Sequence, residues 1–170
     1  MHDGQATLPG DFVAGLVEGE GCFAIKFRRD IKRNRPGAPV YFGWQALFAI
    51  VLRKDDALLL EKVMNTLGCG SISYSGTTAR YHVQDTYMLV DKVMPFFKTY
   101  GLYGKKQEDF QLWCEAIELI SRNKRKGINL TKGKRGFARV VWDEVDLQRL
   151  EEIRHAMIVF KSTRTSAFKW

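Results

Sequence analysis

The chain has 170 residues, of which 45% are hydrophobic and 12% aromatic; these values predict one folded domain and exclude a disordered chain. No apolar run approaches the ~20 residues that span a bilayer, and the N-terminus resembles neither a secretory nor a transit signal. The three cysteines, Cys22, Cys69 and Cys114, are far apart, which argues against a disulfide framework or a zinc site and favours reduced thiols in a core.

The formal net charge of +8 comes from two segments. Residues 26–35 hold six Lys or Arg and one Asp, residues 119–142 hold eight Lys or Arg and no acid, and the remainder of the chain is net acidic. Basic residues concentrated in this way are typical of a protein that binds a polyanion. The alternative is a pair of solvated loops kept for solubility, but two separate basic segments favour a nucleic acid as the partner.

A helix is predicted from near Phe12 to Gly21, with Gly10 and Asp11 as its cap. After this helix, apolar residues alternate with increasingly basic ones, which predicts a strand with one apolar face. The predicted elements of this half are that strand over about 23–28, a turn-rich basic loop over 29–39, a second strand over 41–52, and a helix from Asp55 to Gly68.

The second half of the chain begins with a predicted hairpin around Gly76. The later elements are strands over 71–75 and 79–84, a helix over about 86–94 that stops near Pro95, a longer helix through 110–120, a basic loop over 122–139, and a last helix over about 143–160. The order α-β-β-α-β-β-α, followed by two more helices, predicts an α+β layer fold with antiparallel strands. Residues 1–170 form one domain in this interpretation, with a core over about 8–120 and a C-terminal basic loop and helix over about 121–160.

Two carboxylates crowd the C-terminal end of the first predicted helix, Glu18 and Glu20. Acids are disfavoured at that end because the helix macrodipole is negative there. A cation is therefore expected nearby, and in a basic chain a divalent metal shared with a phosphate is the natural candidate. Gly15 and Gly19 lie one turn apart on this helix and allow another backbone to approach closely, either within the chain or from a partner.

The run F-V-A-G-L-V-E-G-E-G resembles the motif of the LAGLIDADG homing endonucleases. The segments F-A-I-V-L-R-K-D-D, L-G-C-G-S-I and Y-G-K-K-Q-E-D-F also resemble that family, in the same order, over residues 8–120. The resemblance implies a saddle-shaped sheet that lies in the DNA major groove and a site-specific endonuclease that cuts both strands. Because the motif occurs once, it implies a homodimer and a long, near-palindromic target. The helix would pair with its copy through Gly15, Gly19, Val13 and Leu16.

The resemblance also implies an active site. Glu20 would bind Mg²⁺ with help from the Gly19 carbonyl, and Glu18 would act at the helix end or at the interface. Relatives often carry a polar residue where this chain has Leu52 or Arg53, so the sequence leaves open which of the two takes that place; Arg53 is the one that could reach a phosphate. Lys105 and Lys106 both fit the place of a basic residue that stabilises charge in the transition state, and either could be the catalytic one.

The predicted DNA contacts form three groups. The uncovered face of the sheet would carry Lys26, Arg28, Gln45, Ser73, Ser75, Arg80 and His82. The first basic loop would reach outer base pairs or the backbone with Arg29, Lys32, Arg33 and Arg35. The segment from Arg122 to Arg139 would hold the phosphate backbone, chiefly with Lys132, Lys134, Arg135 and Arg139. For each residue the alternative is an exposed charge that touches no ligand.

Two other functions fit the same fold: an RNA maturase that assists intron splicing, and a DNA-binding regulator that does not cut. Glu20 argues against both, because a non-cutting protein has no reason to keep an acid at an unfavourable helix end. The endonuclease interpretation predicts Mg²⁺ as cofactor, double-stranded DNA and a second copy as partners, and intron RNA as a further candidate partner. It also predicts an intron-encoded protein inside the cell, in a prokaryotic cytoplasm or nucleoid or in an organelle.

Overall fold

The computed structural model describes the backbone of residues 6–31, 40–131, 140 and 142–165, and the side chains of residues 6–27, 43–128, 140 and 142–157. Its four strands form one antiparallel sheet in the order β1-β2-β4-β3, where the strands are β1 (Gly21–Ile31), β2 (Val40–Arg53), β3 (Ser71–Ser75) and β4 (Thr78–Val83). The long β1–β2 hairpin pairs Gly21 with Ile50 and Ile31 with Val40. This confirms the predicted α+β class with its antiparallel pairs of strands.

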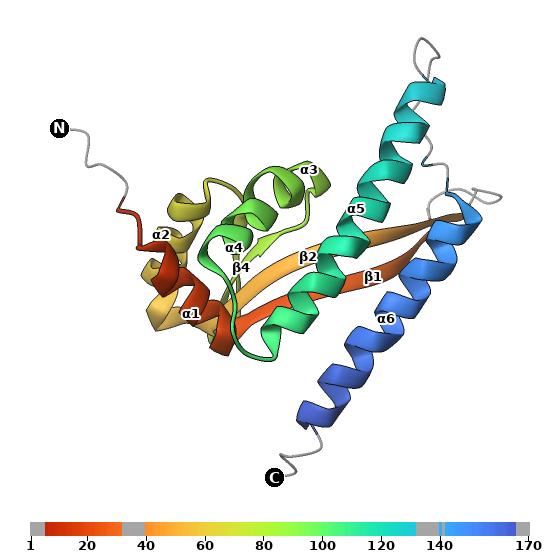
Figure 1. Ribbon diagram of the computed structural model, residues 1–170. Helices are drawn as coiled ribbons and strands as arrows, with labels where there is room; N and C mark the ends of the chain where they lie inside the picture. Colours follow the sequence, from red (N-terminus) through yellow and green to blue (C-terminus); the bar gives the residue numbers. More distant parts are fainter. Residues whose placement is uncertain (1–5, 32–39, 132–139, 141, 166–170) are drawn as a thin grey trace.

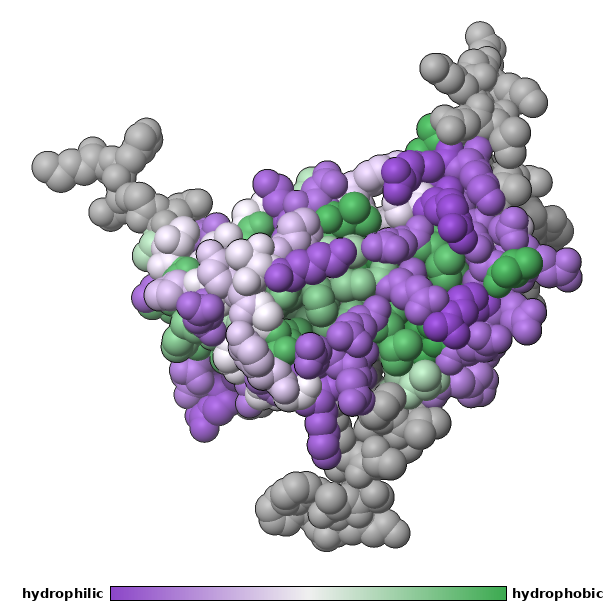
Figure 2. All heavy atoms as spheres, in the orientation of Figure 1, coloured by the Kyte–Doolittle hydropathy of each residue, from purple (hydrophilic) through white to green (hydrophobic). Residues whose placement is uncertain are grey.

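The helices lie on one face of this sheet (Figure 1). They are α1 (Gly10–Glu20), α2 (Ala57–Leu67), α3 (Thr86–Met88), α4 (Met94–Tyr100), α5 (Lys106–Thr131) and α6 (Glu144–Thr165), with a 3-10 turn at Lys54–Asp56 and a π-helical turn at Leu89–Val93. Hydrophilic side chains dominate the surface over α5 and α6, whereas apolar side chains show between the helices nearer the centre (Figure 2). Among the described residues, no helix is both long and apolar enough to cross a membrane.

An aromatic cluster joins α4 and α5 to the central strands. The ring of Phe23 on β1 lies 5.2 Å from that of Phe48, 5.7 Å from Phe97, 5.3 Å from Phe110 and 5.0 Å from Trp113. The indole of Trp113 also donates a hydrogen bond of 3.1 Å to the carbonyl oxygen of Leu47 on β2. Large rings and a satisfied indole N–H fix α5 across the hairpin, and therefore fix the loop that leads into α5.

The predicted helix over 86–94 differs from the observed structure. Pro95 occupies the first turn of α4, and the helical segment continues to Tyr100. Proline is tolerated in a first helical turn, and Pro95 lies in that turn of α4, where the sequence interpretation took it as a stop. The segment ends at Gly101, whose φ of 69° suits glycine.

The prediction of a basic loop over 122–139 is wrong for residues 122–131, which extend α5 to Thr131. Basic side chains of this helical part make contacts within the chain. Arg122 pairs with Asp146 on α6, Lys124 Nζ lies 2.6 Å from Thr86 Oγ1, and Lys126 Nζ lies 3.6 Å from a carboxylate oxygen of Asp143. These charges join α5 to its neighbours, so this part of the segment is tied to the fold before any DNA is bound.

Candidate active site

The face of the sheet opposite the helices carries the polar residues that the sequence placed there. The register sets Lys26 beside Gln45, and Arg80 beside Ser73. His82 and Ser75 fall on the same face, since antiparallel partners share a face and alternate residues return to it. We call this surface, made by Lys26, Gln45, Ser73, Ser75, Arg80 and His82, the open face.

Other predicted DNA contacts lie outside the described residues. The backbone of Arg28 and Arg29 lies in β1, but the side chains of these two residues are not described. The remaining ones fall outside the described backbone altogether: Lys32, Arg33, Arg35, Lys132, Lys134, Arg135 and Arg139.

The middle of the open face is apolar. Leu47 and Ala49 point to this face but are only 3% and 1% exposed, and neither belongs to the main core cluster. Gln45 donates a hydrogen bond of 3.3 Å to Gln84. Gln84 is the residue after Val83, which pairs with Phe48 at the end of β4. Gln84 is thus a polar residue of the open face, where the alternation with Arg80 and His82 places it, although it was not among the predicted DNA contacts.

Two polar atoms on the open face are buried and have no hydrogen-bond partner within the described part of the chain: Arg80 Nε and His82 Nδ1. The other ring nitrogen of His82 lies 3.3 Å from Ser71 Oγ. Buried polar groups are normally hydrogen-bonded, so each unpaired one needs an explanation. Neither atom has accessible surface, so a base edge or a phosphate would pair with it only after the side chain moves.

Glu20 stands where α1 meets the open face. It is the last residue of α1 and is exposed, and the next residue, Gly21, already pairs with Ile50 in the sheet. A β-carbon at Gly21 would lie 2.5 Å from Val17 Cγ1 and 2.7 Å from the Val17 carbonyl oxygen. Only glycine therefore permits this direct passage from helix to strand, and the passage fixes where the carboxylate of Glu20 leaves the chain.

The carboxylate oxygens of Glu20 fit part of a magnesium site. A carboxylate is the kind of oxygen ligand that Mg²⁺ prefers, and in proteins that ion usually keeps waters and substrate phosphate oxygens as its other ligands. The described residues hold no group of three or more His, Cys, Asp or Glu that could bind a metal. The described chain thus offers a partial site, of the kind that a phosphate and a second protein copy would complete.

Glu18 has a different environment from Glu20. One of its carboxylate oxygens accepts hydrogen bonds from the backbone N–H groups of Tyr103, at 2.5 Å, and Gly104, at 2.9 Å. These amides precede the N-terminus of α5, where the helix dipole is positive. The sequence argument expected a cation near both acids, but backbone amides satisfy Glu18. Glu20 is left as the exposed carboxylate at this end of the helix.

The structure separates the alternatives at the other predicted catalytic positions. Leu52 packs against the core, whereas Arg53 points away from it, with a side chain that is 81% exposed and an ion pair of 2.8 Å to Asp55. Lys105 is exposed just before α5, whereas Lys106 is 9% exposed. Arg53 and Lys105 are therefore the two whose side chains are exposed at the surface.

The four residues predicted to pair α1 with its copy differ in exposure. A β-carbon at Gly15 or Gly19 would meet no described atom within 4 Å, and Phe12 beside them is 50% exposed. Leu16 is half-buried against the core. Val13, which the sequence interpretation assigned to a dimer interface, is completely buried among core residues of its own chain. That assignment is wrong, because a side chain with no exposed surface has none to offer a partner.

The comparison with known protein families decides the class. The sequence model described as LAGLIDADG endonuclease matches residues 13–117, which include most of α1, the whole sheet and the first part of α5. The chain belongs to the LAGLIDADG endonuclease family. This confirms the resemblance that was drawn from the motif and from the three downstream segments.

Two curated relatives carry related names. The chain is 35% identical over 103 residues to a probable intron-encoded DNA endonuclease 1 of Mycosarcoma maydis, which covers 60% of this chain and 34% of the relative. It is 32% identical over 129 residues to an uncharacterized 50.9 kDa protein in ND4 intron 1 of Podospora anserina, covering 75% of this chain and 27% of the relative. The chain therefore spans about a third or less of each of these proteins.

Solved structures share the fold. The structure of I-SmaMI bound to an uncleaved DNA target in the presence of calcium ions superposes with a TM-score of 0.66 at 24% identity, over 89% of this chain and 45% of that one. The structure of the I-LtrWI LAGLIDADG homing endonuclease bound to target DNA gives a TM-score of 0.70 at 20% identity, over 92% and 46%. The match confirms the predicted homing-endonuclease fold, and this chain corresponds to less than half of either neighbour.

Proposed function

We propose that this chain is a site-specific endonuclease that hydrolyses both strands of a long, near-palindromic DNA target as a homodimer. The observation that carries the proposal is Glu20, an exposed carboxylate placed by α1 at the margin of a polar sheet face. The names of the Mycosarcoma maydis relative and of the DNA-bound I-LtrWI structure support DNA as the substrate. The relative named for ND4 intron 1 supports an intron-encoded origin, and we place the protein inside the cell, in an organelle or a prokaryotic nucleoid.

The residues of the site divide the work. Glu20, with the carbonyl of Gly19, would hold Mg²⁺, which when bound supplies a Lewis acid that neutralises charge on the phosphate and lowers the pKa of a bound water. Lys105 would place its ammonium group beside the developing negative charge, and Arg53 would bind a phosphate oxygen after exchanging its pairing with Asp55. The open face would bind the major groove, and its residues would set the preference for bases.

A second copy is needed because one chain provides one such set of residues. The exposed stripe of Phe12, Gly15 and Gly19 on α1 allows two helices to pack backbone to backbone. A two-fold axis along that contact would bring two copies of Glu20 together and would require a target with matching symmetry. The share of each DNA-bound neighbour that this chain covers, 45% and 46%, supports a complete unit of two such domains.

The test uses a duplex that carries the joined exons flanking the reading frame in its genome. We expect double-strand cleavage at one site with Mg²⁺ and none with EDTA, and no cleavage of a duplex with the same bases in scrambled order. Sedimentation of the complex, formed without Mg²⁺, should give two chains per duplex. A single chain per duplex, or cutting that is indifferent to EDTA, would overturn the proposal.

One observation favours a second candidate, a DNA- or RNA-binding protein on the same fold that does not cut. The family resemblance implies a polar residue, commonly Gln, where this chain has Leu52 or Arg53; here Leu52 packs against the core and a carboxylate already pairs with Arg53. Such a protein would bind the joined-exon duplex, or its own intron RNA as a maturase, and would leave the DNA intact at every Mg²⁺ concentration. Splicing of the intron transcript with and without the protein separates the maturase from the regulator.

A further inference from the structure

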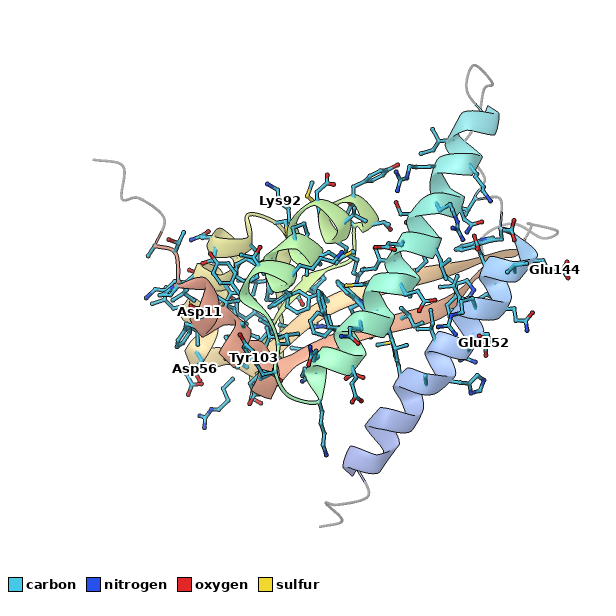
Figure 3. All side chains as sticks on the ribbon, in the orientation of Figure 1. Asp11, Asp56, Lys92, Tyr103, Glu144 and Glu152 are labelled. Atoms are coloured by element: carbon cyan, nitrogen blue, oxygen red, sulfur yellow. The ribbon has the colours of Figure 1, made fainter. Side chains whose placement is uncertain are left out.

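Two links hold the segment that leads into α5 along the side of α1. At one end of α1, the ring of Tyr100 packs directly on the backbone of Gly10, since a β-carbon there would lie 2.2 Å from Tyr100 Cζ. At the other end, the carboxylate of Glu18 accepts the N–H groups of Tyr103 and Gly104 at 2.5 and 2.9 Å. Figure 3 labels Tyr103 in the loop between α4 and α5, beside α1.

The second link joins two parts of the proposed active site. Glu18 lies two residues before Glu20 on α1, and Gly104 lies directly before Lys105. These groups are 86 positions apart in the chain, so no local backbone geometry would otherwise hold them in register. The hydrogen bonds to Glu18 are thus the direct polar connection from the helix that carries the acid to the loop that carries the ammonium group.

The loop is shaped for this connection. A β-carbon at Gly104 would lie 2.8 Å from Glu18 Oε2, so a larger residue there would displace the carboxylate. The φ of Gly101 is 69°, which lets the loop turn sharply after α4. The carbonyl oxygen of Gly104 accepts from the N–H of Gln107 at 3.0 Å and so joins the same residue to the first turn of α5. Glu18 therefore holds a loop that continues without a break into a long, packed helix.

We propose that Glu18 is a positioning residue that fixes Lys105 relative to Glu20. This rests on the proposed function, and it assigns to the first acid of the motif a role that is separate from metal binding. Hydrogen bonds from amides to an ionised acceptor are short and roughly twice as strong as neutral ones, which suits a contact that has to hold a loop. A displacement of about 1 Å in a reacting group costs roughly 100-fold in rate.

The test is a double-mutant cycle between Glu18→Ala and Lys105→Ala, read as single-turnover cleavage of the joined-exon duplex at saturating protein and Mg²⁺. We expect each single variant to slow cleavage by about 10- to 100-fold with the Kd for the duplex unchanged. In the Lys105→Ala background, Glu18→Ala should add less than about threefold, because the group it positions is already absent. Independent, multiplying losses would show that Glu18 acts through something else.

Three further variants complete the design. Glu18→Gln keeps an oxygen that can accept both N–H groups, and it should restore most of the rate. Gly104→Ala keeps the charge of Glu18 but crowds it, and it should slow cleavage as Glu18→Ala does; this variant also serves if Glu18→Ala does not fold. Asp11→Ala is the matched control: Asp11 is an exposed acid on α1 that lines the same cavity of about 420 Å³ as Glu18, Tyr103 and Gly104. It should cut at the wild-type rate.

Hydrogen exchange provides a measurement that does not depend on cleavage. The amides of Tyr103 and Gly104 should lose protection in Glu18→Ala and keep it in Asp11→Ala, with no DNA or metal added. Unchanged protection would overturn the inference, as would a Lys105→Ala variant that cuts at the wild-type rate. Failure of the proposed function looks different, because wild-type protein would then leave the duplex intact while the exchange pattern still followed Glu18.

Discussion

The most informative stability prediction concerns Asn123, a buried amide at the junction of α5 and α6. Its Nδ2 donates to the Leu119 carbonyl at 2.8 Å and to Asp146 at 2.6 Å, and its Oδ1 accepts the N–H of Asp143 at 2.8 Å. Asn123→Leu keeps the branched shape and the number of side-chain heavy atoms but leaves the Asp143 N–H unpaired and removes one of the donors to Asp146. An unsatisfied buried group costs about 1–3 kcal/mol. The Asp143 N–H is one such group, whereas Asp146 still accepts from Arg122, so the expected loss is about 1–3 kcal/mol.

The assay is equilibrium unfolding in urea, with hydrogen exchange on residues 144–157 to locate the effect. We expect the midpoint to fall and the protection of α6 to be lost first, because this network joins α6 to α5. The exposed residue Gln148 on α6 gives the control, since Gln148→Ala should change the free energy of unfolding by less than about 0.5 kcal/mol. If Asn123→Leu is as mild as that control, the network does not hold the two helices together.

Three further predictions concern acid, thiols and the α1 stripe. Hydrogen bonds from Arg122 lower the pKa of Asp146, so its contribution to stability is present above the ordinary carboxyl value of about 4 and is lost as pH falls through the lowered value. Protection of α6 should fall in that range, and it should fall less in Asp146→Asn, where only the other carboxylates with lowered pKa values, Glu115 and Glu151, still titrate. An equal fall in both proteins would contradict this role of Asp146. Burial raises the pKa of Cys114 to about 12, so a thiol reagent near pH 8 should modify exposed Cys22 quickly and Cys114 only on unfolding. Bound duplex should slow the reaction of Cys22. Equal rates for both thiols would contradict the packing of α5. Gly15→Leu should not lower the free energy of unfolding of the isolated chain, because its surroundings are open and leucine favours a helix more than glycine does, but it should abolish the two-chain complex on DNA. Intact assembly would exclude this stripe as the contact.

Much of the fold could be predicted because its signals are local. Alternation along β1 and β4 placed Lys26, Arg80 and His82 on one face, and the register confirms it. The errors arose where packing overrides local pattern. Pro95 begins α4, and residues 122–131 are helical because Asp143, Asp146 and Thr86 provide partners for their charges. Those partners lie far away in sequence, and no periodicity reveals them.

For the site, as for the fold, the sequence predicted what depends on local pattern and missed what depends on packing. The motif located Glu20 without a structure, but it did not show which face of α1 is buried, so Val13 was wrongly assigned to an interface. The choices between Leu52 and Arg53, and between Lys105 and Lys106, depend on which side chain turns toward the core. The contacts of Glu18 with residues 103 and 104 depend on how a distant loop returns to α1, which one sequence does not encode in any local spacing.

The account depends most on the carboxylate of Glu20, and Glu20→Gln tests it directly because the change removes charge with little change in size. The Kd for the joined-exon duplex and the single-turnover cleavage rate should be measured on the same preparation at saturating Mg²⁺. We predict a Kd within about threefold of the wild-type value and a cleavage rate reduced by at least roughly 1000-fold. Cleavage of the duplex by Glu20→Gln at the wild-type rate would contradict the account.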